Sequence, residues 1–123
     1  MWMYQQSTGE LSHYGRLVTI GYSGAGEGRN NPALQAVVDV GPIPRGDYII
    51  GPPECSIVPG PHGPYVLRLT RAPGTNTEGR DGFLIHGDAI EHPGAASHGC
   101  IVILRWAREL IASSGDDRLR VVA

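Results

Sequence analysis

The chain has 123 residues, enough for one compact domain spanning residues 1–123 and too few for two ordinary ones. Its 41% of hydrophobic residues excludes wholesale disorder, and its 18 Gly and 10 Pro show no tripeptide period, which excludes collagen. With 10 basic and 12 acidic residues, a net charge of −2 and no apolar run near the roughly 18 residues that span a bilayer, the sequence predicts no nucleic-acid partner and no membrane span.

Short segments rich in β-branched and aromatic residues alternate with Gly, Pro and Ser turns, which predicts strands. In chain order the predicted strands are 2–6, 11–14, 16–22, 47–50, 65–70, 83–86 and 119–122. Pro and Gly fill residues 51–64, which are expected to form a loop. Residues 24–32 are also expected to form a loop, in which Asn30-Asn31-Pro32 indicates a turn.

Helical periodicity occurs in one stretch, residues 104–111, where apolar residues recur at spacings of three and four. These apolar residues are Leu104, Ala107, Leu110 and Ile111, and the charged residues on other faces are Arg105, Arg108 and Glu109. Ser113-Ser114-Gly115 ends the helix. Several short strands and one late helix predict a mainly-β domain.

A histidine at the end of a predicted strand and a cysteine 14 residues later form the pattern that carries chemistry. The strand 83–86 ends in His86, so a rigid element holds the imidazole, and Cys100 comes just before the apolar run 101–103. A free cysteine has a pKa of about 8.5, and a neighbouring imidazolium can lower it by several units. The pair therefore predicts Cys100 as nucleophile and His86 as base.

The residues just before Cys100 have supporting roles in this interpretation. Gly99 lets the backbone turn sharply, and the amides of Gly99 and Cys100 can donate to a developing oxyanion. Ser97 and His98 are expected to fix the loop by hydrogen bonds. Two groups are candidates to orient the imidazole of His86: the carboxylate of Asp88 and the backbone carbonyl of Gly87.

The paired motifs His86-Gly87 and Ser97-His98-Gly99-Cys100 resemble the signature of YkuD-type L,D-transpeptidases, which process peptidoglycan. The turn at residues 41–48 resembles the strand-entering turn of that fold. The chain is similar above all to a short subgroup of L,D-transpeptidase-like toxins delivered by type VI secretion systems. The segments that carry this likeness are 1–9, 21–24, 30–32 and 79–87.

This resemblance implies a YkuD-like β-sandwich with one short C-terminal helix, without cofactor or metal. It implies that Cys100 attacks the carbonyl at the L-centre of meso-diaminopimelate in a tetrapeptide stem and expels the terminal D-Ala. Water then gives a tripeptide, which is L,D-carboxypeptidase activity. An amine gives a crosslink or an exchanged D-amino acid, which is L,D-transpeptidase activity.

The expected partners are peptidoglycan stem peptides, an immunity protein and the secretion apparatus. Residues 1–6 lack both the basic and the apolar regions of a secretory signal peptide. The resemblance implies that a secretion machine replaces such a signal, so that the protein acts in the periplasm of a target bacterium.

The sequence departs from the classical transpeptidases at two points. Cys100 follows His86 more closely than it does there, which trims the covering loop, and Val102 stands where a polar residue usually follows the nucleophile. Arg80 and Arg105 are the residues predicted to recognise a substrate carboxylate, since a guanidinium suits bidentate pairing.

Three other interpretations remain open from the sequence. A catalytically silent cell-wall-binding module would keep the fold without turnover. A zinc site would draw on His86, His98 and Cys100, with His92 or Asp88 as a further ligand. A disulfide between Cys55 and Cys100 would abolish the thiol chemistry.

Overall fold

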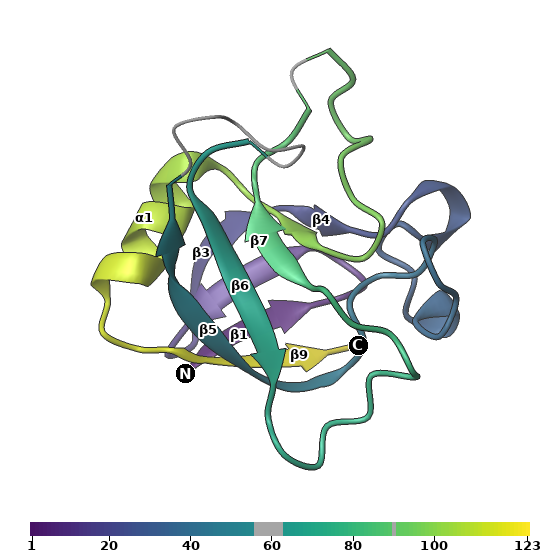
Figure 1. Cartoon of the computed structure of the whole chain (residues 1–123), viewed down its shortest axis with the longest axis horizontal. Coiled ribbons are helices and arrows are strands. Elements are labelled where there is room, and N and C mark those ends of the chain that lie inside the picture. Colours follow the sequence, from purple (N-terminus) through teal and green to yellow (C-terminus); the bar gives the residue numbers. More distant parts are fainter. Residues whose placement is uncertain (56–62, 90) are drawn as a thin grey trace.

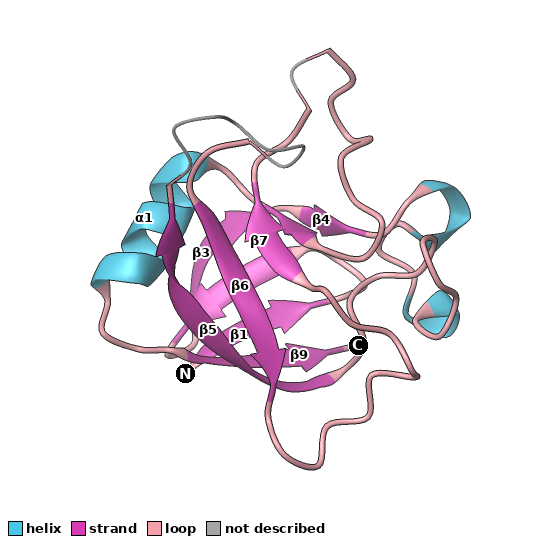
Figure 2. Ribbon diagram, in the orientation of Figure 1, coloured by secondary structure: helices cyan, strands magenta, loops and turns pink. Residues whose placement is uncertain are grey.

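The structure is a computed structural model of the chain, and it describes residues 1–55, 63–89 and 91–123. The strands are β1 (Trp2–Gln5), β2 (Glu10–His13), β3 (Arg16–Ile20), β4 (Tyr22–Ser23), β5 (Gly46–Glu54), β6 (Val66–Arg71), β7 (Leu84–His86), β8 (Ile101–Val102) and β9 (Arg118–Val122). The helical elements are the 3-10 turns η1 (Gly26–Gly28) and η2 (Pro32–Leu34) and the α-helix α1 (Arg105–Ser113). Figure 2 shows strands and loops dominating, which confirms the predicted mainly-β class with one short C-terminal α-helix.

The strands form one sheet in the order β3-β2-β1-β9-β5-β6-β7-β8-β4, which curls until it is nearly closed (Figure 1). Two neighbouring pairs are parallel, β1 with β9 and β7 with β8, and the others are antiparallel. The closing strand β9 therefore sits between the N-terminal hairpin and β5. The parallel pair β7–β8 brings the end of β7 beside the end of β8, and β4 is the edge strand next to β8.

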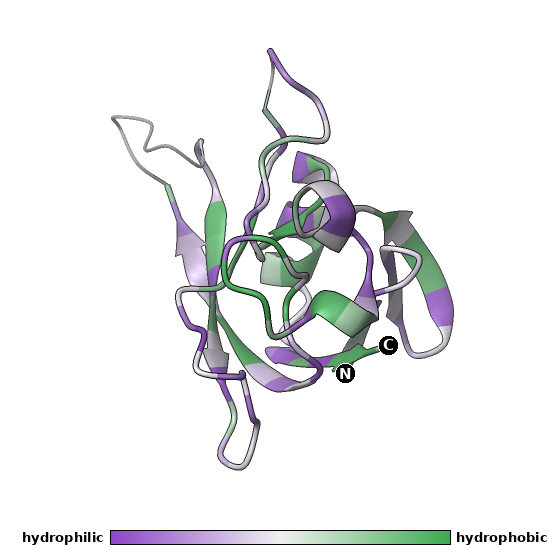
Figure 3. Cartoon of the chain, turned by 90° about the vertical axis from the view of Figure 1, so that its right-hand side faces the viewer, coloured by the Kyte–Doolittle hydropathy of each residue, from purple (hydrophilic) through white to green (hydrophobic). Residues whose placement is uncertain are grey.

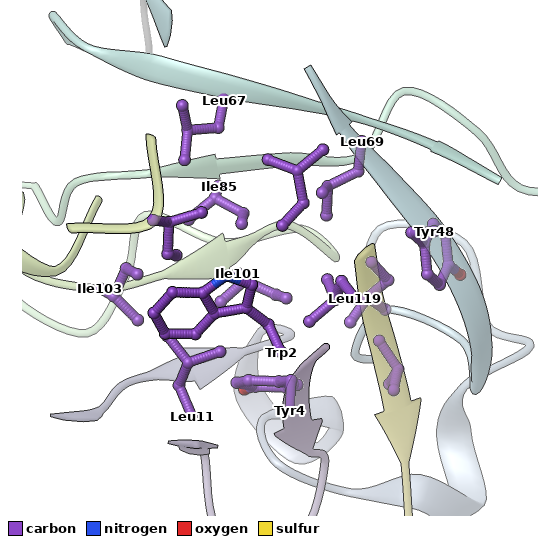
Figure 4. Packing of buried hydrophobic residues seen from close by; sticks show 14 of the residues in the cluster. Trp2, Tyr4, Leu11, Tyr48, Leu67, Leu69, Ile85, Ile101, Ile103 and Leu119 are labelled. Atoms are coloured by element: carbon purple, nitrogen blue, oxygen red, sulfur yellow. The ribbon is translucent and has the colours of Figure 1, made fainter. Parts of the chain in front are cut away.

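The interior of the curled sheet is filled by alternate side chains from its strands. In β1, Trp2 and Tyr4 are buried while Met3 is exposed, and bands of different hydropathy alternate along the strands in Figure 3. Figure 4 shows Trp2 packed among side chains from several other strands, including Ile85 and Ile101. This period-2 burial is the signal from which the strands are predictable.

Strand β5 is longer than expected, because it continues through Gly51-Pro52-Pro53-Glu54 instead of ending at Ile50. Its pairing with β6 shifts between Ile50 and Pro53, which marks a bulge. Its other neighbour, β9, pairs only with residues 46–49. The prolines therefore lie where β5 has lost one neighbour, so their missing N–H groups leave no hydrogen bond unmade on that side.

The turn expected at Asn30-Asn31-Pro32 is present. The side chain of Asn31 accepts a hydrogen bond from the backbone N–H of Ala33, and Pro32 begins η2. The other segment expected as a loop, 51–64, is replaced by β5 at its start, and residues 56–62 of it lie outside the described residues.

Helix α1 begins and ends close to its predicted bounds, but its buried face differs from the prediction. Ala107 and Ile111 pack into the core, whereas Leu104 and Leu110 are exposed. The buried face includes Arg108, which is 6% exposed. Arg108, which was placed on a different face from the apolar residues, therefore belongs to the buried face. In the part of the chain that the structure describes, no helix has the length and apolarity to cross a membrane.

Candidate active site

His86 lies at the end of β7 and is held from its own backbone neighbour. The preceding residue, Ile85, is in the core, so the alternation of the strand turns His86 to the opposite face, where it is 1% exposed. Its Nδ1 lies 2.7 Å from the carbonyl oxygen of Gly87. Because a carbonyl oxygen only accepts, Nδ1 is the donor, and Nε2 is the basic nitrogen of the neutral ring.

Asp88 does not contact the His86 ring nitrogen, although it was one of the two candidates for orienting it. Its carboxylate accepts hydrogen bonds from Tyr22 Oη at 2.6 Å, Ala89 N at 2.9 Å and Gly94 N at 3.0 Å. Burial alone would raise the pKa of Asp88, but these hydrogen bonds outweigh it and hold the pKa below its usual value. Asp88 therefore organises the loop after β7, and the Gly87 carbonyl orients the histidine.

A cavity of about 1040 Å³ opens beside His86, near the upper limit of the roughly 300–1,000 Å³ of small-molecule sites. Its walls come from the strand ends, from the loop after β7 that projects from the sheet in Figure 1, and from the first turns of α1. The predicted site residues that line it are His86, Gly87, Asp88, His98 and Arg105. The described lining also contains Val102, opposite His86 in the β7–β8 pair, and Arg108.

The loop before Cys100 is held by serine hydroxyls. Buried Ser97 accepts hydrogen bonds through Oγ from Gly24 N at 2.9 Å and Gly99 N at 3.1 Å, and donates to the Cys100 carbonyl at 2.6 Å. Ser23 Oγ donates to the carbonyl of Gly99 at 3.1 Å. The amide of Gly99, expected to face an oxyanion, is thus engaged by Ser97.

Cys100 immediately precedes β8 and is partly buried. Extending the register of Ile85 with Ile101 back by one residue places Cys100 beside Leu84, on the same face as His86. Its Sγ lies 3.9 Å from the carbonyl oxygen of Gly82 and does not belong to the described cavity lining. Both Cys100 and Cys55 are free, so the structure contains no disulfide between them.

Burial raises the pKa of the Cys100 thiol, and the Leu84 N–H and the positive charge of Arg80 only partly offset this effect. The lowered pKa expected from a neighbouring imidazolium is therefore not found in this structure. A raised pKa means a smaller thiolate fraction at any given pH.

The raised pKa predicts slow alkylation of Cys100 at neutral pH. The pH at which the alkylation rate reaches half of its maximum is expected to be higher for Cys100 than for a small free thiol. The rate of reaction with iodoacetamide is measured against pH in a Cys55→Ser background, where Cys100 is the remaining cysteine, and followed by intact mass. A midpoint below that of the free thiol would instead indicate a thiolate–imidazolium pair in the resting protein.

Arg80 does not line the cavity beside His86, so its contacts there give no support to the prediction that it binds a substrate carboxylate. It is 6% exposed, and its guanidinium donates to the carbonyls of Gln35 at 2.6 Å, Pro42 at 2.8 Å, Gly41 at 3.0 Å and His98 at 3.2 Å. These acceptors occupy its terminal nitrogens and tie the loop at 35–42 to the Cys100 loop. Arg80 is a buried structural cation.

Gly99 is required by this arrangement. Its φ is +134°, which L side chains rarely adopt, and a Cβ there would collide with Nη2 of Arg80. The glycine therefore lets the buried guanidinium of Arg80 lie directly against the Cys100 loop.

Arg105 and His98 both line the cavity but differ from expectation in their contacts. Arg105 pairs through Nε with Glu109 at 2.9 Å and lies over the ring of Tyr65, and its side chain is 53% exposed. His98 contacts the carbonyl of Asp39 through Nδ1 at 3.3 Å. Among the described residues, no three His, Cys, Asp or Glu side chains gather as metal ligands do.

Arg108 is the site residue that the sequence interpretation missed. It donates through Nη1 to the carbonyls of Pro64 at 3.1 Å and Tyr65 at 2.8 Å. The signal was present, because Arg108 lies three residues before Ile111 and so borders the buried stripe of α1. The sequence alone does not show whether a charged residue at that position lies in solvent or beside a cavity.

A protein-family model matches most of the chain. The model of the Tlde1 domain, the L,D-transpeptidase effector domain of type VI secretion, matches residues 18–122 of this chain. The match includes every candidate site residue named above. A search of curated proteins finds no match.

Proposed function

The chain belongs to the Tlde1 domain family, and from this premise we propose that it modifies peptidoglycan stem peptides through an acyl-enzyme on Cys100. The observation that carries the proposal is His86, a buried imidazole oriented by the Gly87 carbonyl at the edge of a large cavity. Cys100 immediately precedes the adjacent parallel strand β8, and extending the β7–β8 register by one residue places it on the same face as His86. This is the set of parts that nucleophilic acyl transfer uses: a thiol, a base and an acceptor that orients the base.

The reaction begins when His86 Nε2 takes the thiol proton as Cys100 Sγ turns from Gly82 and attacks the carbonyl carbon at the L-centre of meso-diaminopimelate. The carbon–nitrogen bond to the terminal D-Ala breaks, and the imidazolium returns the proton to the leaving amine. A thioester and free D-Ala result. Water then hydrolyses the thioester to a tripeptide, or the amine of another stem or of a D-amino acid forms a new amide, and either path restores the thiol.

The surrounding residues serve this chemistry by position. Ser97 and Ser23 hold the Cys100 loop, and the amide of Cys100 is the oxyanion donor that remains of the two expected, because Ser97 engages the other. Asp88 and His98 shape the cavity. No cofactor or metal enters these steps.

The site of action follows from the family. A type VI effector is delivered to a target bacterium, so the substrate is met in the periplasm of that cell. An immunity protein in the producing cell and components of the secretion apparatus are the expected protein partners.

The test is intact mass spectrometry of peptidoglycan tetrapeptides after incubation with wild type, Cys100→Ala and Cys55→Ala. We expect wild type and Cys55→Ala to remove D-Ala, or to exchange it for an added D-amino acid, and Cys100→Ala to do neither. Loss of D-Ala alone indicates hydrolysis, and exchange indicates transfer.

Two outcomes would contradict the proposal. Unchanged masses with folded, reduced wild type would favour a silent cell-wall-binding module, which binds stem peptides without turnover. Activity that survives Cys100→Ala but is lost on chelation would favour a zinc protein.

A further inference from the structure

One edge of the Arg108 guanidinium, formed by Nε and Nη2, has no hydrogen-bond partner among the described residues. Nη1 is occupied by two backbone carbonyls, but in the part of the chain that the structure describes neither Nε nor Nη2 has a hydrogen bond, and Nε is fully buried. Nη2 lies against Gly87, where a Cβ would come within 2.9 Å of it. The unpartnered edge thus borders the residue that orients His86, and Arg108 lines the same cavity.

Nε and Nη2 together are the pair of donors that binds a carboxylate side-on. The chain shows this elsewhere: Arg120 binds Asp47 through Nε at 2.8 Å and Nη2 at 3.2 Å. Arg108 has no such carboxylate among the described residues, although it is 6% exposed. Burial and the nearby charge of Arg105 lower the pKa of Arg108, and Glu109 and Tyr65 only partly offset this effect.

We propose that Arg108 binds the terminal carboxylate of the D-amino acid that the enzyme removes or exchanges, an inference that rests on the proposed function. His86 must return a proton to the leaving amine, and in an amino acid the carboxylate carbon is two bonds from that nitrogen. An anion site beside Gly87 is therefore close to the position that the carboxylate of the leaving amino acid occupies when its amine faces His86. Gly87 has no side chain to separate the two groups.

This assignment has consequences for specificity. The enzyme should prefer a donor peptide that ends in a free D-amino acid, because a neutral amide at that position offers one acceptor oxygen and no charge to the guanidinium. The acceptor in an exchange must also carry a carboxylate, since it enters the place that the leaving residue has vacated. Arg108 then selects chain ends over internal bonds.

The test compares a tetrapeptide ending in D-Ala with its C-terminal carboxamide, using wild type, Arg108→Lys, Arg108→Gln and the control Arg120→Gln, since Arg120 is outside the cavity lining and pairs with Asp47. We expect wild type to favour the acid by about 10- to 100-fold in kcat/KM, the range of a charge-assisted hydrogen bond. Arg108→Gln abolishes that preference by slowing the acid alone. Arg108→Lys keeps part of the preference, because lysine retains the charge but cannot form two parallel hydrogen bonds to one carboxylate. Arg120→Gln keeps the preference in full.

Equal losses on acid and amide, or a preference that survives Arg108→Gln, would overturn the proposal and leave Arg108 a structural tie to Pro64 and Tyr65. Binding of the two peptides to Cys100→Ala and to Cys100→Ala/Arg108→Gln, by calorimetry, needs no turnover. A preference for the acid that requires Arg108 supports the anion site even if wild type turns over no stem peptide. Equal binding of acid and amide by Cys100→Ala overturns it.

Discussion

Replacement of Arg80 by methionine is expected to lower the free energy of unfolding by about 3–5 kcal/mol. Several hydrogen bonds from a charged donor, each contributing about 1.5–3 kcal/mol, are lost, while the desolvation cost of the buried cation is relieved. The guanidinium joins four backbone carbonyls from two separate segments. Methionine fills much of the same volume but donates nothing, so these carbonyls lose a donor in a site that water does not readily reach. Chemical denaturation at equilibrium measures the change.

Arg68→Met is the matched control, because Arg68 is an exposed arginine paired with Glu54. Its effect is expected to stay within about 0.5 kcal/mol, as for other exposed ion pairs. Arg80→Lys separates charge from geometry, since lysine cannot reach four carbonyls with one ammonium group. Comparable stability of Arg80→Met and Arg68→Met would show that the carbonyl network contributes little.

His86→Gln is expected to reduce the rate of D-Ala release by about 10²–10⁴-fold, the usual contribution of a general acid–base group. Glutamine preserves hydrogen bonding but cannot carry a proton from the thiol to the leaving amine. The rate is measured with tetrapeptide stems under conditions where circular dichroism shows the variant folded. A rate close to that of wild type would remove His86 from the mechanism.

Asp88→Asn is the informative comparison for the group that orients His86. Because the Gly87 carbonyl holds Nδ1, the loss with Asp88→Asn is expected to be far smaller than with His86→Gln. Asparagine can still accept hydrogen bonds from Tyr22 and the Gly94 amide. A loss of about 10⁴-fold, as for the buried aspartate of a serine-protease triad, would restore Asp88 as the orienting group.

The predictable part of the site is the part in which a residue's neighbours in sequence are also its neighbours in space. His86 and Gly87 are adjacent, so the Gly87 carbonyl could be named as an orienting group before the fold was known. Ser97 acts within its own loop, on Gly99 and Cys100. The strands and α1 were similarly predictable, because the spacing of apolar residues within each segment indicates a strand or a helix.

The roles of the arginines were not predictable in this way. Arg80 was expected to bind a substrate carboxylate and instead ties Gln35 and Pro42 to the Cys100 loop. Arg108 was placed on a face of the helix without the apolar residues, but it is buried and lines the cavity. A long, charged side chain has the same local signature whether it lies in water or against backbone carbonyls. Only the packing of segments distant in sequence supplies its partners.

The sequence by itself therefore determined the mainly-β class, the late helix, the family and the pairing of a histidine motif with a cysteine motif. The fold class and the helix depend on the short-range spacing of apolar residues. The family and the paired motifs depend on a combination of His, Gly and Cys that few other kinds of site use. The tertiary structure alone decided that Arg108 borders the cavity, that Gly87 rather than Asp88 orients His86, and that burial raises the pKa of Cys100. The physical reason is that hydrogen-bond geometry and desolvation depend on which distant segments exclude water from a group, and closure of the sheet sets those contacts.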